Sequence, residues 1–511
     1  MARHSTDPAW LDPLQSVHSP PLTSDTTADV CVIGAGIAGL TTAYRLADAG
    51  RSVVLLDAGS APGCGETRYT TAHLASAIDD RFAEVARIRG ADAARLAHES
   101  HAAAVTEIER IVQAEGIACG FRRVPGYLFP APGDTKTIDE EFEAARAAGC
   151  AVGRLAACPA SALGSGPCLK FENQGTFEPS RYMAGLWAAA AGRGVRLFTN
   201  TRVVSVEGGK ETTVKTDKGQ AVSGAAVVVA TNTPVHTRFA LHTKLAPYMT
   251  YAIAGTVPRG TLPDALFWDT ADPYHYVRLI TRRDQDSRDT DLLLVGGADH
   301  KVGQEPDPGR RWDDLEAWTK ARFPDFGGVK HNWSGMVMET LDGLAYIGRD
   351  PTGEDNVFLA AGDSGMGLTH GTIAGLLLTD LILGRPNPWA DLYAPGRLPI
   401  KSGGEYASEN VNVARQYTDW FTGGDVKSVE EIRPGNGAVV RRGLTKLAVF
   451  RDKSDGSLHV RSAVCPHLSG IVRWNPAEGT WDCPCHGSRF KADTGEVIHG
   501  PATGGLPEAT A

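Results

Sequence analysis

Two cysteines and two histidines near the C-terminus are the residues whose types and spacing point most directly to chemistry. They fall in two short boxes, Cys465-Pro-His467 and Cys483-Pro-Cys-His486, separated by fifteen residues (468–482). Two thiolates and two imidazoles can hold a two-iron, two-sulfide cluster, with the thiolates on one iron and the imidazoles on the other. The same donors also suit one tetrahedral zinc ion. Zinc sites usually pair Cys with Cys and His with His, whereas each box here carries one of each, so the pattern favours the iron–sulfur cluster.

The second box continues as Cys-Pro-Cys-His-Gly-Ser-Arg-Phe490, and residues 425–511 resemble a Rieske 2Fe-2S domain. The resemblance implies an all-β module whose cysteines and histidines bind a 2Fe-2S cluster. Such a cluster accepts and releases one electron at a time. The predicted cluster ligands are Cys465, His467, Cys483 and His486. Their imidazole edges are expected near the surface of the module, as the outlet for electrons.

Two positions depart from the high-potential respiratory proteins that this module resembles. Gly470 stands where those proteins carry a cysteine that forms a disulfide with the residue matching Cys485. Phe490 stands where they carry a tyrosine that donates a hydrogen bond near a ligand sulfur, and phenylalanine has no donor. Ser488 remains as a donor toward the cluster. We therefore expect no bracing disulfide and a reduction potential below the respiratory range.

A glycine-rich turn near the N-terminus predicts a second cofactor. An apolar strand ends in Gly34-Ala-Gly36-Ile-Ala-Gly39, a helix is expected over Thr41–Ala49, and the next strand, Ser52–Leu56, ends at an aspartate. In such a unit the glycines allow a tight turn, close approach to a pyrophosphate and close helix–strand packing, while the acid holds a ribose hydroxyl. Because strand, helix and acid are all present, a glycine turn without a ligand is the weaker interpretation. The predicted contacts are Gly34, Ala35, Gly36, Ile37, Ala38, Gly39, Asp57 and Ala58.

A second glycine-rich segment identifies the dinucleotide. Gly362-Asp-Ser-Gly365-Met-Gly367 follows an apolar strand and opens a predicted helix through Leu383, which would aim a second helix N-terminus at the same ligand. With further strands expected at Thr201–Glu207 and Ala225–Thr231, residues 26–395 resemble the FAD-dependent amine and amino-acid oxidoreductases of the D-amino-acid oxidase type. The resemblance implies FAD as the cofactor and adds these contacts: Thr70, Thr71, Ala72, Val203, Gly362, Asp363, Gly365, Met366, Gly367 and Leu368.

The candidate catalytic residues follow from what such enzymes do. The resemblance implies that FAD takes a hydride from the carbon next to nitrogen, so the protein mainly orients the substrate. His73 lies on the loop expected to pass the flavin ring, and His370 at a helix N-terminus that favours neutral imidazole; capping or packing is the alternative for both. Tyr274, Tyr276 and Arg278 alternate along a predicted strand and would line an anionic-substrate pocket, the alternative for Arg278 being a surface charge.

Composition narrows the class of protein. A length of 511 residues predicts about three domains, and the net charge of −9 argues against nucleic acid as a partner. No stretch approaches the roughly 18 apolar residues of a membrane span, and the N-terminus lacks the apolar core of a signal peptide. Nine scattered cysteines suit a reducing compartment, so a cytoplasmic location is expected.

The motifs fix the expected domain organisation. The fold class is an α/β Rossmann-like FAD-binding domain with an α+β substrate domain, plus a C-terminal all-β Rieske domain. A long helical stretch is expected from Arg81 to Glu115, and a helix at Ser408–Phe421. The parts are a polar N-terminal segment (1–25), an FAD-dependent domain (26–395) with FAD-binding pieces near 26–75, 175–237 and 335–390 and substrate-domain pieces near 76–174 and 238–334, a linker with a helix (396–424), and the Rieske domain (425–511).

The two modules together predict a function. FAD collects two electrons from an amine or amino-acid C–N bond, and a Rieske cluster would export them singly to an external acceptor such as a ferredoxin or cytochrome. This favours a dehydrogenase over an oxygen-using oxidase. One alternative is a reductase that takes electrons from NAD(P)H or ferredoxin, although no second nicotinamide-type glycine motif occurs in a strand–helix context. Another alternative is a non-enzymatic redox sensor.

Overall fold

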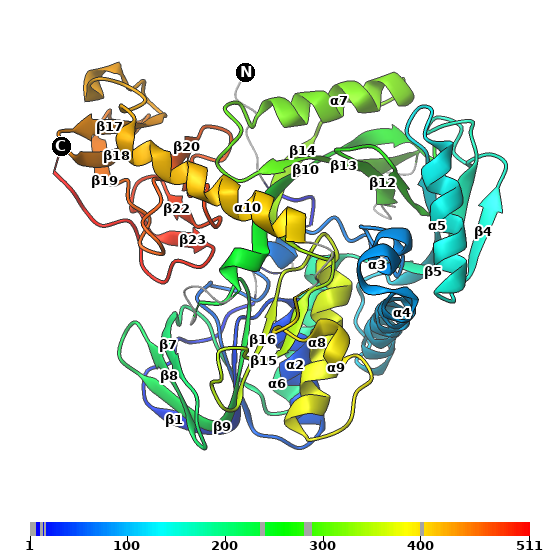
Figure 1. Cartoon of the computed structure of the whole chain (residues 1–511), viewed down its shortest axis with the longest axis horizontal. Helices are drawn as coiled ribbons and strands as arrows, with labels where there is room; N and C mark the ends of the chain where they lie inside the picture. The colour runs from blue at the N-terminus through cyan, green and yellow to red at the C-terminus, as the bar shows by residue number, and fades with distance from the viewer. Residues whose placement is uncertain are drawn as a thin grey trace.

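The computed structural model of the chain describes residues 7–10, 14, 17–235, 241–280, 289–398 and 403–510. Figure 1 shows a sheet with helices in the lower half, a second sheet beneath helix α7 in the upper half, and a C-terminal module (residues 425–510) at the left. Parts of the predicted N-terminal segment and residues 399–402 of the predicted linker lie outside the described residues.

The first sheet is mainly parallel, and its strand order β15-β16-β9-β1-β2-β6 places the first strand of the chain near the centre. β2 and the second half of β1 are fully buried, as their runs of valine, isoleucine and leucine require. β15 pairs antiparallel at one edge, and the β7–β8 hairpin joins through β9. The strands are β1 (Thr26–Ile33), β2 (Val53–Leu56), β6 (Arg196–Phe198), β7 (Val203–Glu207), β8 (Thr212–Thr216), β9 (Ala221–Asn232), β15 (Tyr346–Arg349) and β16 (Val357–Ala361).

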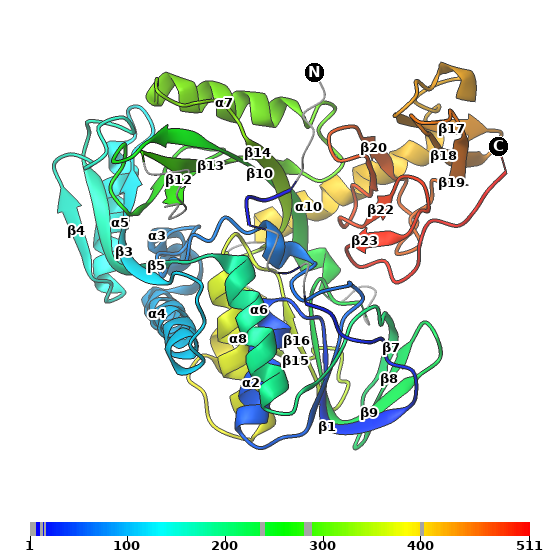
Figure 2. The same cartoon turned by 180° about the vertical axis from the view of Figure 1, so that it is seen from behind.

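Three helices pack together beside this sheet: α2 (Ile37–Asp48), α6 (Pro179–Gly192) and α8 (Gly367–Ile382), as Figures 1 and 2 show from opposite sides. α2 and α8 approach closely because a glycine faces the contact, where a Cβ at Gly375 would lie 2.4 Å from the Thr41 side chain. α2 begins inside the glycine motif, four residues before the predicted helix. Because β1 and β16 are both parallel to β9, the helices that follow them start at the same edge of the sheet.

The second sheet is antiparallel except where β11 pairs with β3, and its order is β14-β10-β13-β12-β11-β3-β5-β4. Both predicted insertions contribute strands to it, although most of β14 falls in the third predicted FAD-binding piece (335–390). β10 is buried along most of its length, which indicates that both faces of this strand are covered. The strands are β3 (Arg122–Phe129), β4 (Val152–Leu155), β5 (Cys168–Thr176), β10 (Leu245–Pro258), β11 (Leu266–Asp269), β12 (His275–Ile280), β13 (Thr290–Lys301) and β14 (His331–Thr340).

The stretch from Arg81 to Glu115, which was expected to be helical, forms two helices in the structure: α3 (Phe82–Arg89) and α4 (Ala91–Ala114). Gly90 separates them with φ of 93°, a left-handed conformation that ends a helix and that glycine adopts readily. The stretch is therefore helical on both sides of a break at Gly90. The remaining elements of this half are α5 (Thr135–Ala147), α7 (Arg310–Arg322), α9 (Ala390–Tyr393), η1 (Glu66–Tyr69) and η2 (His242–Lys244).

The C-terminal module consists of two small antiparallel sheets, which confirms the predicted all-β class. A linker helix, α10 (Gly403–Gln416), crosses to it from the rest of the molecule (Figure 1) and ends in the 3-10 turn η5 (Tyr417–Phe421). The other elements are η6 (Val429–Glu431), the first sheet β17 (Gly437–Arg442), β18 (Thr445–Arg451) and β19 (Leu458–Ser462), and the second sheet β20 (Arg473–Asn475), β21 (Thr480–Asp482), β22 (Arg489–Lys491) and β23 (Val497–His499).

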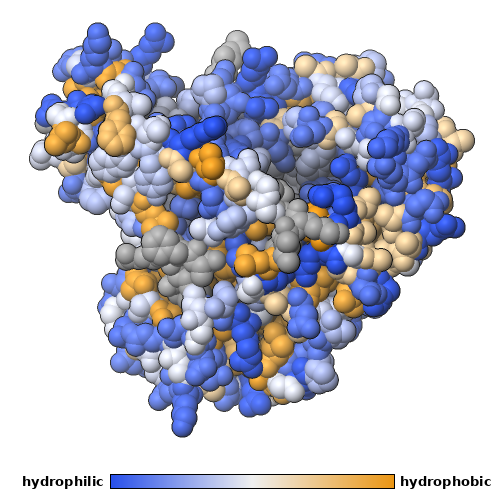
Figure 3. Space-filling model, in the orientation of Figure 1, coloured by the Kyte–Doolittle hydropathy of each residue, from blue (hydrophilic) through white to orange (hydrophobic). Residues whose placement is uncertain are grey.

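Hydrophilic residues predominate on the face of the molecule in Figure 3, with hydrophobic ones scattered among them. Within the described ranges, no helix is both long and apolar enough to cross a membrane.

Candidate functional site

A cavity of about 1030 Å³ is lined by residues of both large sheets and of the C-terminal module. The turn after β1 and the turn before α8 both face it, together with the η1 segment. Most predicted cofactor contacts lie on its wall. These are Gly34, Gly36, Ile37, Ala38, Asp57, Ala58, Thr70, Thr71, Val203, Gly362, Asp363, Gly365, Met366, Gly367 and Leu368. Ala35, Gly39 and Ala72 were predicted as contacts but are not among the lining residues.

The glycine motif has the geometry that a pyrophosphate site needs. Gly34 has φ of 102°, and a Cβ there would lie 2.5 Å from the Ala230 carbonyl oxygen. A Cβ at Gly39 would lie 1.9 Å from the Gly34 carbonyl oxygen, so this glycine serves packing rather than contact. At Gly36 the only atom within 4 Å would be Thr67 Oγ1, at 3.3 Å. Gly36 therefore opens onto the cavity just before α2 begins, where backbone N–H groups favour an anion.

Asp57 lies at the end of β2, as the strand–acid pattern predicts. Its Oδ2 accepts a hydrogen bond from the Ala35 N–H at 2.5 Å, and its Oδ1 accepts one from the Gly59 N–H at 2.6 Å. Burial raises the pKa of this carboxyl, and the two backbone donors oppose that effect. The acid is thus held rigidly at the cavity wall, where it fits a ribose hydroxyl. Val203, at the start of β7, lies on the same stretch of wall.

The two candidate histidines both line the cavity and are both neutral near pH 7. Burial lowers the pKa of His73 to about 3 and that of His370 to about 4. Both ring nitrogens of His370 are engaged, Nδ1 with the Asp363 carbonyl at 2.9 Å and Nε2 with the Ala345 N–H at 3.3 Å. His370 therefore positions the turn before α8. His73 Nε2 lies 3.3 Å from the Val277 carbonyl, and its ring packs edge-on against Tyr276.

The predicted anionic-substrate pocket differs from the structure. Tyr274 and Tyr276 line the cavity, but Arg278 does not. Arg278 is 4% exposed, donates a hydrogen bond to Thr176 and lies 5.8 Å from the Trp10 ring centroid. The three residues share a strand face, as alternation predicts, yet the cavity ends before the third. An acid, Asp79, accepts a hydrogen bond from the Tyr274 hydroxyl at 3.1 Å instead.

The predicted cluster ligands come together in two loops of the C-terminal module. Cys465 and Cys483 are 1% and 2% exposed, and the rings of His467 and His486 lie 5.0 Å apart. His486 Nδ1 is buried and has no hydrogen-bond partner in the described part of the chain. Buried thiols and an unpartnered imidazole nitrogen fit a two-iron cluster.

Comparison with known proteins agrees with both sites. The FAD dependent oxidoreductase family matches residues 29–381, and the Rieske [2Fe-2S] domain matches residues 423–510. The chain belongs to the FAD-dependent oxidoreductase family. FAD and a 2Fe-2S cluster are thereby confirmed as its cofactors.

Relatives share one or both modules. YhfW of Bacillus subtilis (strain 168), named as a Rieske 2Fe-2S iron-sulfur protein, is 29% identical over 98% of this chain and 97% of its own length. Gamma-glutamylputrescine oxidoreductase of Escherichia coli (strain K12) is 26% identical over 71% of this chain and 85% of its own. The structure of glycine oxidase from Geobacillus kaustophilus superposes with a TM-score of 0.60 at 19% identity, covering 73% of this chain and 99% of that one, which shows a shared fold.

All nine cysteines are free, and Gly470 has no thiol to offer Cys485. A Cβ at Gly470 would lie 2.6 Å from Cys485 Sγ, so position 470 is where a disulfide partner would sit. Hydrogen bonds from η5 hold this cluster loop instead. The Tyr417 hydroxyl donates to the Leu468 carbonyl at 2.6 Å, and the Trp420 indole N–H donates to the Ser469 carbonyl at 2.9 Å.

The cluster histidines lie at an edge of the module that the rest of the chain covers. His486 is 6% exposed, and the His242 ring of η2 packs 4.5 Å from the His467 ring and 5.9 Å from the His486 ring. A Cβ at Gly487 would lie 2.6 Å from the Pro247 side chain. The module therefore turns its histidine edge toward the FAD-binding part of its own chain, which no local motif signals.

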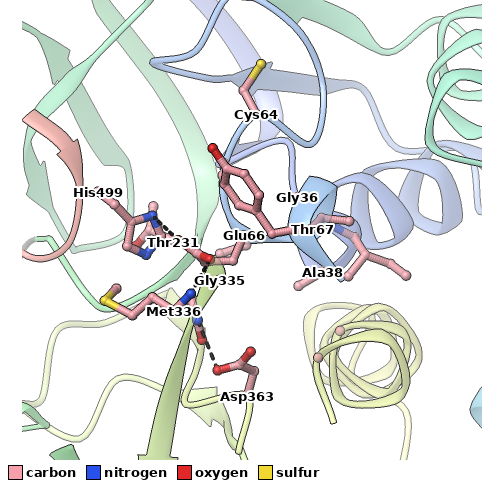
Figure 4. Close-up of a pocket in the computed structure, with 18 of the residues that line it drawn as sticks. Gly36, Ala38, Cys64, Glu66, Thr67, Thr231, Gly335, Met336, Asp363 and His499 are labelled. Atoms are coloured by element: carbon pink, nitrogen blue, oxygen red, sulfur yellow. Dashed lines mark hydrogen bonds and ion pairs between the residues drawn. The ribbon is translucent and has the colours of Figure 1, made fainter. Parts of the chain in front are cut away.

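Glu66, Met336 and His499 also line the FAD cavity but escaped the prediction of individual contacts. Figure 4 shows Glu66 between the other two, joined to each by a dashed line. Glu66 Oε2 accepts a hydrogen bond from the Met336 N–H at 2.6 Å, and Oε1 lies 3.4 Å from His499 Nδ1. Burial raises the pKa of Glu66 to about 7. Only Glu66 had a sequence signal, because it precedes the Thr70–Ala72 contacts on one loop.

Proposed function

We propose that this protein is an FAD-dependent dehydrogenase that oxidises a C–N bond of an amine or amino acid and exports the electrons through its Rieske cluster to an external one-electron acceptor. FAD supplies a two-electron oxidant and the cluster a one-electron carrier. The acceptor, a ferredoxin, cytochrome or similar protein, and the cytoplasmic location stay predictions, to which the nine free thiols lend support.

One observation carries the electron-transfer part of this proposal. Met336 lines the FAD cavity, and a Cβ at Gly487 would lie 2.9 Å from the Met336 sulfur. Gly487 directly follows the cluster ligand His486. A single side chain therefore separates the cavity wall from the loop that holds the cluster. Such proximity favours transfer within the chain over an unrelated use of the two cofactors.

The substrate end of the cavity supports a nitrogen compound as the substrate. Burial, with the nearby Asp80 and Asp299, raises the pKa of Asp79 to about 7. A cationic or polarised nitrogen beside Asp79 would relieve this crowding of acids. Tyr274 and Tyr276 supply two hydroxyls on the same wall, which suits orienting a small polar substrate. The names of the similar gamma-glutamylputrescine oxidoreductase and glycine oxidase, an amine and an amino-acid enzyme, agree with this class.

The test is anaerobic rapid mixing of the purified protein with a panel of amines and amino acids, following flavin absorbance and the cluster's electron paramagnetic resonance signal. We expect an active substrate to bleach the flavin and then reduce the cluster. Bleaching by NAD(P)H alone would support the reductase alternative, and no bleaching by any compound would support the sensor. Cluster reduction that never follows flavin reduction would overturn the proposed route.

A matched pair of variants tests the route itself. Gly487→Ala places a methyl group 2.6 Å from Pro247 and 2.9 Å from the Met336 sulfur, which should push the cluster loop away from the cavity. Gly443→Ala is the control, because Gly443 has a similar positive φ of 60° but no neighbouring atom within 4 Å of a Cβ. Flavin bleaching should stay unchanged in both, while cluster reduction slows only in Gly487→Ala. Equal slowing in both variants would count against the route.

A further inference from the structure

The C-terminal module supplies part of the wall of the FAD cavity. The lining residues from this module come from the β22–β23 hairpin and from the loop that follows it: Lys491, Thr494, Glu496, Val497, Ile498, His499, Gly500, Thr503, Gly504 and Gly505. The same cavity is lined by the predicted FAD contacts of the FAD-binding part. The cavity is therefore incomplete without the cluster module.

Among these residues, His499 has the features of a ligand contact. Its side chain is 13% exposed, and its Nδ1 faces Glu66 at 3.4 Å. Its Nε2 is buried and has no hydrogen-bond partner among the described residues. A buried imidazole nitrogen left unpaired is costly, so a polar ligand atom is expected there. Figure 4 shows the ring beside Glu66 and Thr231, at the cavity wall.

Hydrogen bonds join the module to the rest of the chain. Arg202, which also lines the cavity, donates a hydrogen bond to the Val497 carbonyl at 3.2 Å. Arg473 of the module donates to the Gly303 carbonyl at 3.0 Å, and Ser334 of β14 donates to Glu478. The hairpin is thus bonded to the FAD-binding part through Arg202, and other parts of the same module are bonded to the second sheet and the loop after β13.

We propose that the cluster module is part of the FAD-binding site and that His499 binds a polar atom of FAD through Nε2. The hydroxyls of FAD can both donate and accept, so the match holds for either tautomer of the histidine. FAD and the docked module then stabilise each other, because each binds the conformation that the other favours. This inference rests on the family's cofactor and not on the proposed substrate or direction of electron flow.

The first test measures FAD affinity in the full-length chain. His499→Leu should weaken FAD binding about tenfold, as expected for one lost hydrogen bond to a buried partner, whereas His499→Gln, whose amide can replace Nε2, should stay within about threefold of the parent. His459→Leu is the matched control, because His459 lies in the same module on β19 and is not a cavity-lining residue. Affinity is read from flavin fluorescence during reconstitution of the FAD-free protein, with the cluster signal reporting that the module is folded.

Unchanged affinity in His499→Leu with an intact cluster signal would overturn the role of His499. If the variant does not fold, hydrogen exchange of the parent protein gives a separate answer. Removal of FAD should increase exchange in the 497–505 segment and leave β19 (Leu458–Ser462) of the same module unchanged. Equal protection of the 497–505 segment with and without FAD would overturn the proposal that the module is part of the site.

Discussion

The cluster loops take all four predicted ligands from residues 465–486, whereas the FAD cavity draws its wall from segments between Ile33 and Gly505. In the cluster site, two short sequence motifs contain all the ligands, and the fold only has to bring two loops together. In the FAD site, the glycine motif is a short local sequence. The rest of the cavity wall is formed by the packing of two sheets and a separate module. A cofactor site can therefore have a recognisable sequence motif and still depend on residues far away in the chain.

Loss of one cluster ligand should have the largest effect, and it should be confined to the cluster site. Cys483→Ser should abolish the Rieske electron paramagnetic resonance signal, because a hydroxyl is a poor substitute for a thiolate ligand to iron. Cys485→Ser is the control: Cys485 is equally buried and two residues away, but it is not a predicted ligand. The control should keep its cluster. Iron and sulfide content measure both outcomes, and loss of the cluster in both variants would leave the ligand assignment unsupported.

The second prediction distinguishes a glycine that contacts FAD from a glycine that is needed for packing. Gly36→Val should fold and bind FAD ~100-fold more weakly, because its side chain would enter the open cavity where the pyrophosphate is expected. Gly39→Ala should instead lose the folded protein, since its Cβ would lie 1.9 Å from the Gly34 carbonyl oxygen. FAD content and thermal unfolding distinguish the two. A folded Gly36→Val with normal FAD content would contradict the site.

The cofactors and the fold class could be predicted from the sequence, whereas several residues around the two sites could not. The two boxes and the glycine motif gave the cofactors and the fold class, because ligand spacing and strand–turn–helix patterns are local. Three contacts could not be predicted. Met336 and His499 line the FAD cavity and His242 packs on the cluster ligand His467, and all three come from separate elements that meet only through tertiary packing. Arg278 was misplaced for the same reason: alternation fixes the face of a strand but not where the cavity along that face ends.

A third prediction concerns Asp79, a buried acid on the wall of the FAD cavity. The pKa of Asp79 is raised to about 7 from the ordinary value of 3.8, so the folded chain holds this proton more tightly than the unfolded chain. The free energy of unfolding should therefore fall as pH rises from about 4 to about 7, and the whole loss should persist above pH 7. Asp79→Asn removes this loss.

Thermal unfolding at pH 5 and pH 8 checks the sign. The unfolding temperature of Asp79→Asn relative to the parent should be about 1–3 °C more favourable at pH 8 than at pH 5. Asp355→Asn, a change at an exposed turn, is the control and should show no such pH trend. A relative stability of Asp79→Asn that falls with pH would show that this carboxyl is ionised and stabilised in the folded chain.

The smallest expected effect tunes the cluster without touching the FAD cavity. Phe490 is fully buried beside the cluster loop, where the respiratory proteins that this module resembles carry a hydrogen-bonding tyrosine. Phe490→Tyr should raise the reduction potential, because a donor near a ligand sulfur favours the more negative, reduced cluster. One hydrogen bond of about 0.5–1.5 kcal/mol corresponds to roughly 20–60 mV for a one-electron couple.

A redox titration followed by electron paramagnetic resonance measures that shift. Phe450→Tyr is the matched control, since Phe450 lies on β18 in the same module and stacks on Trp474 away from the ligand loops. FAD affinity should be unchanged in both variants, because neither residue is among those lining the cavity. A potential that rises equally in both would trace the effect to the module's general polarity, and no rise in Phe490→Tyr would mean that the hydroxyl does not reach a ligand sulfur. A rise confined to Phe490→Tyr would show that the potential is set within the local loops, while the FAD site depends on the whole chain.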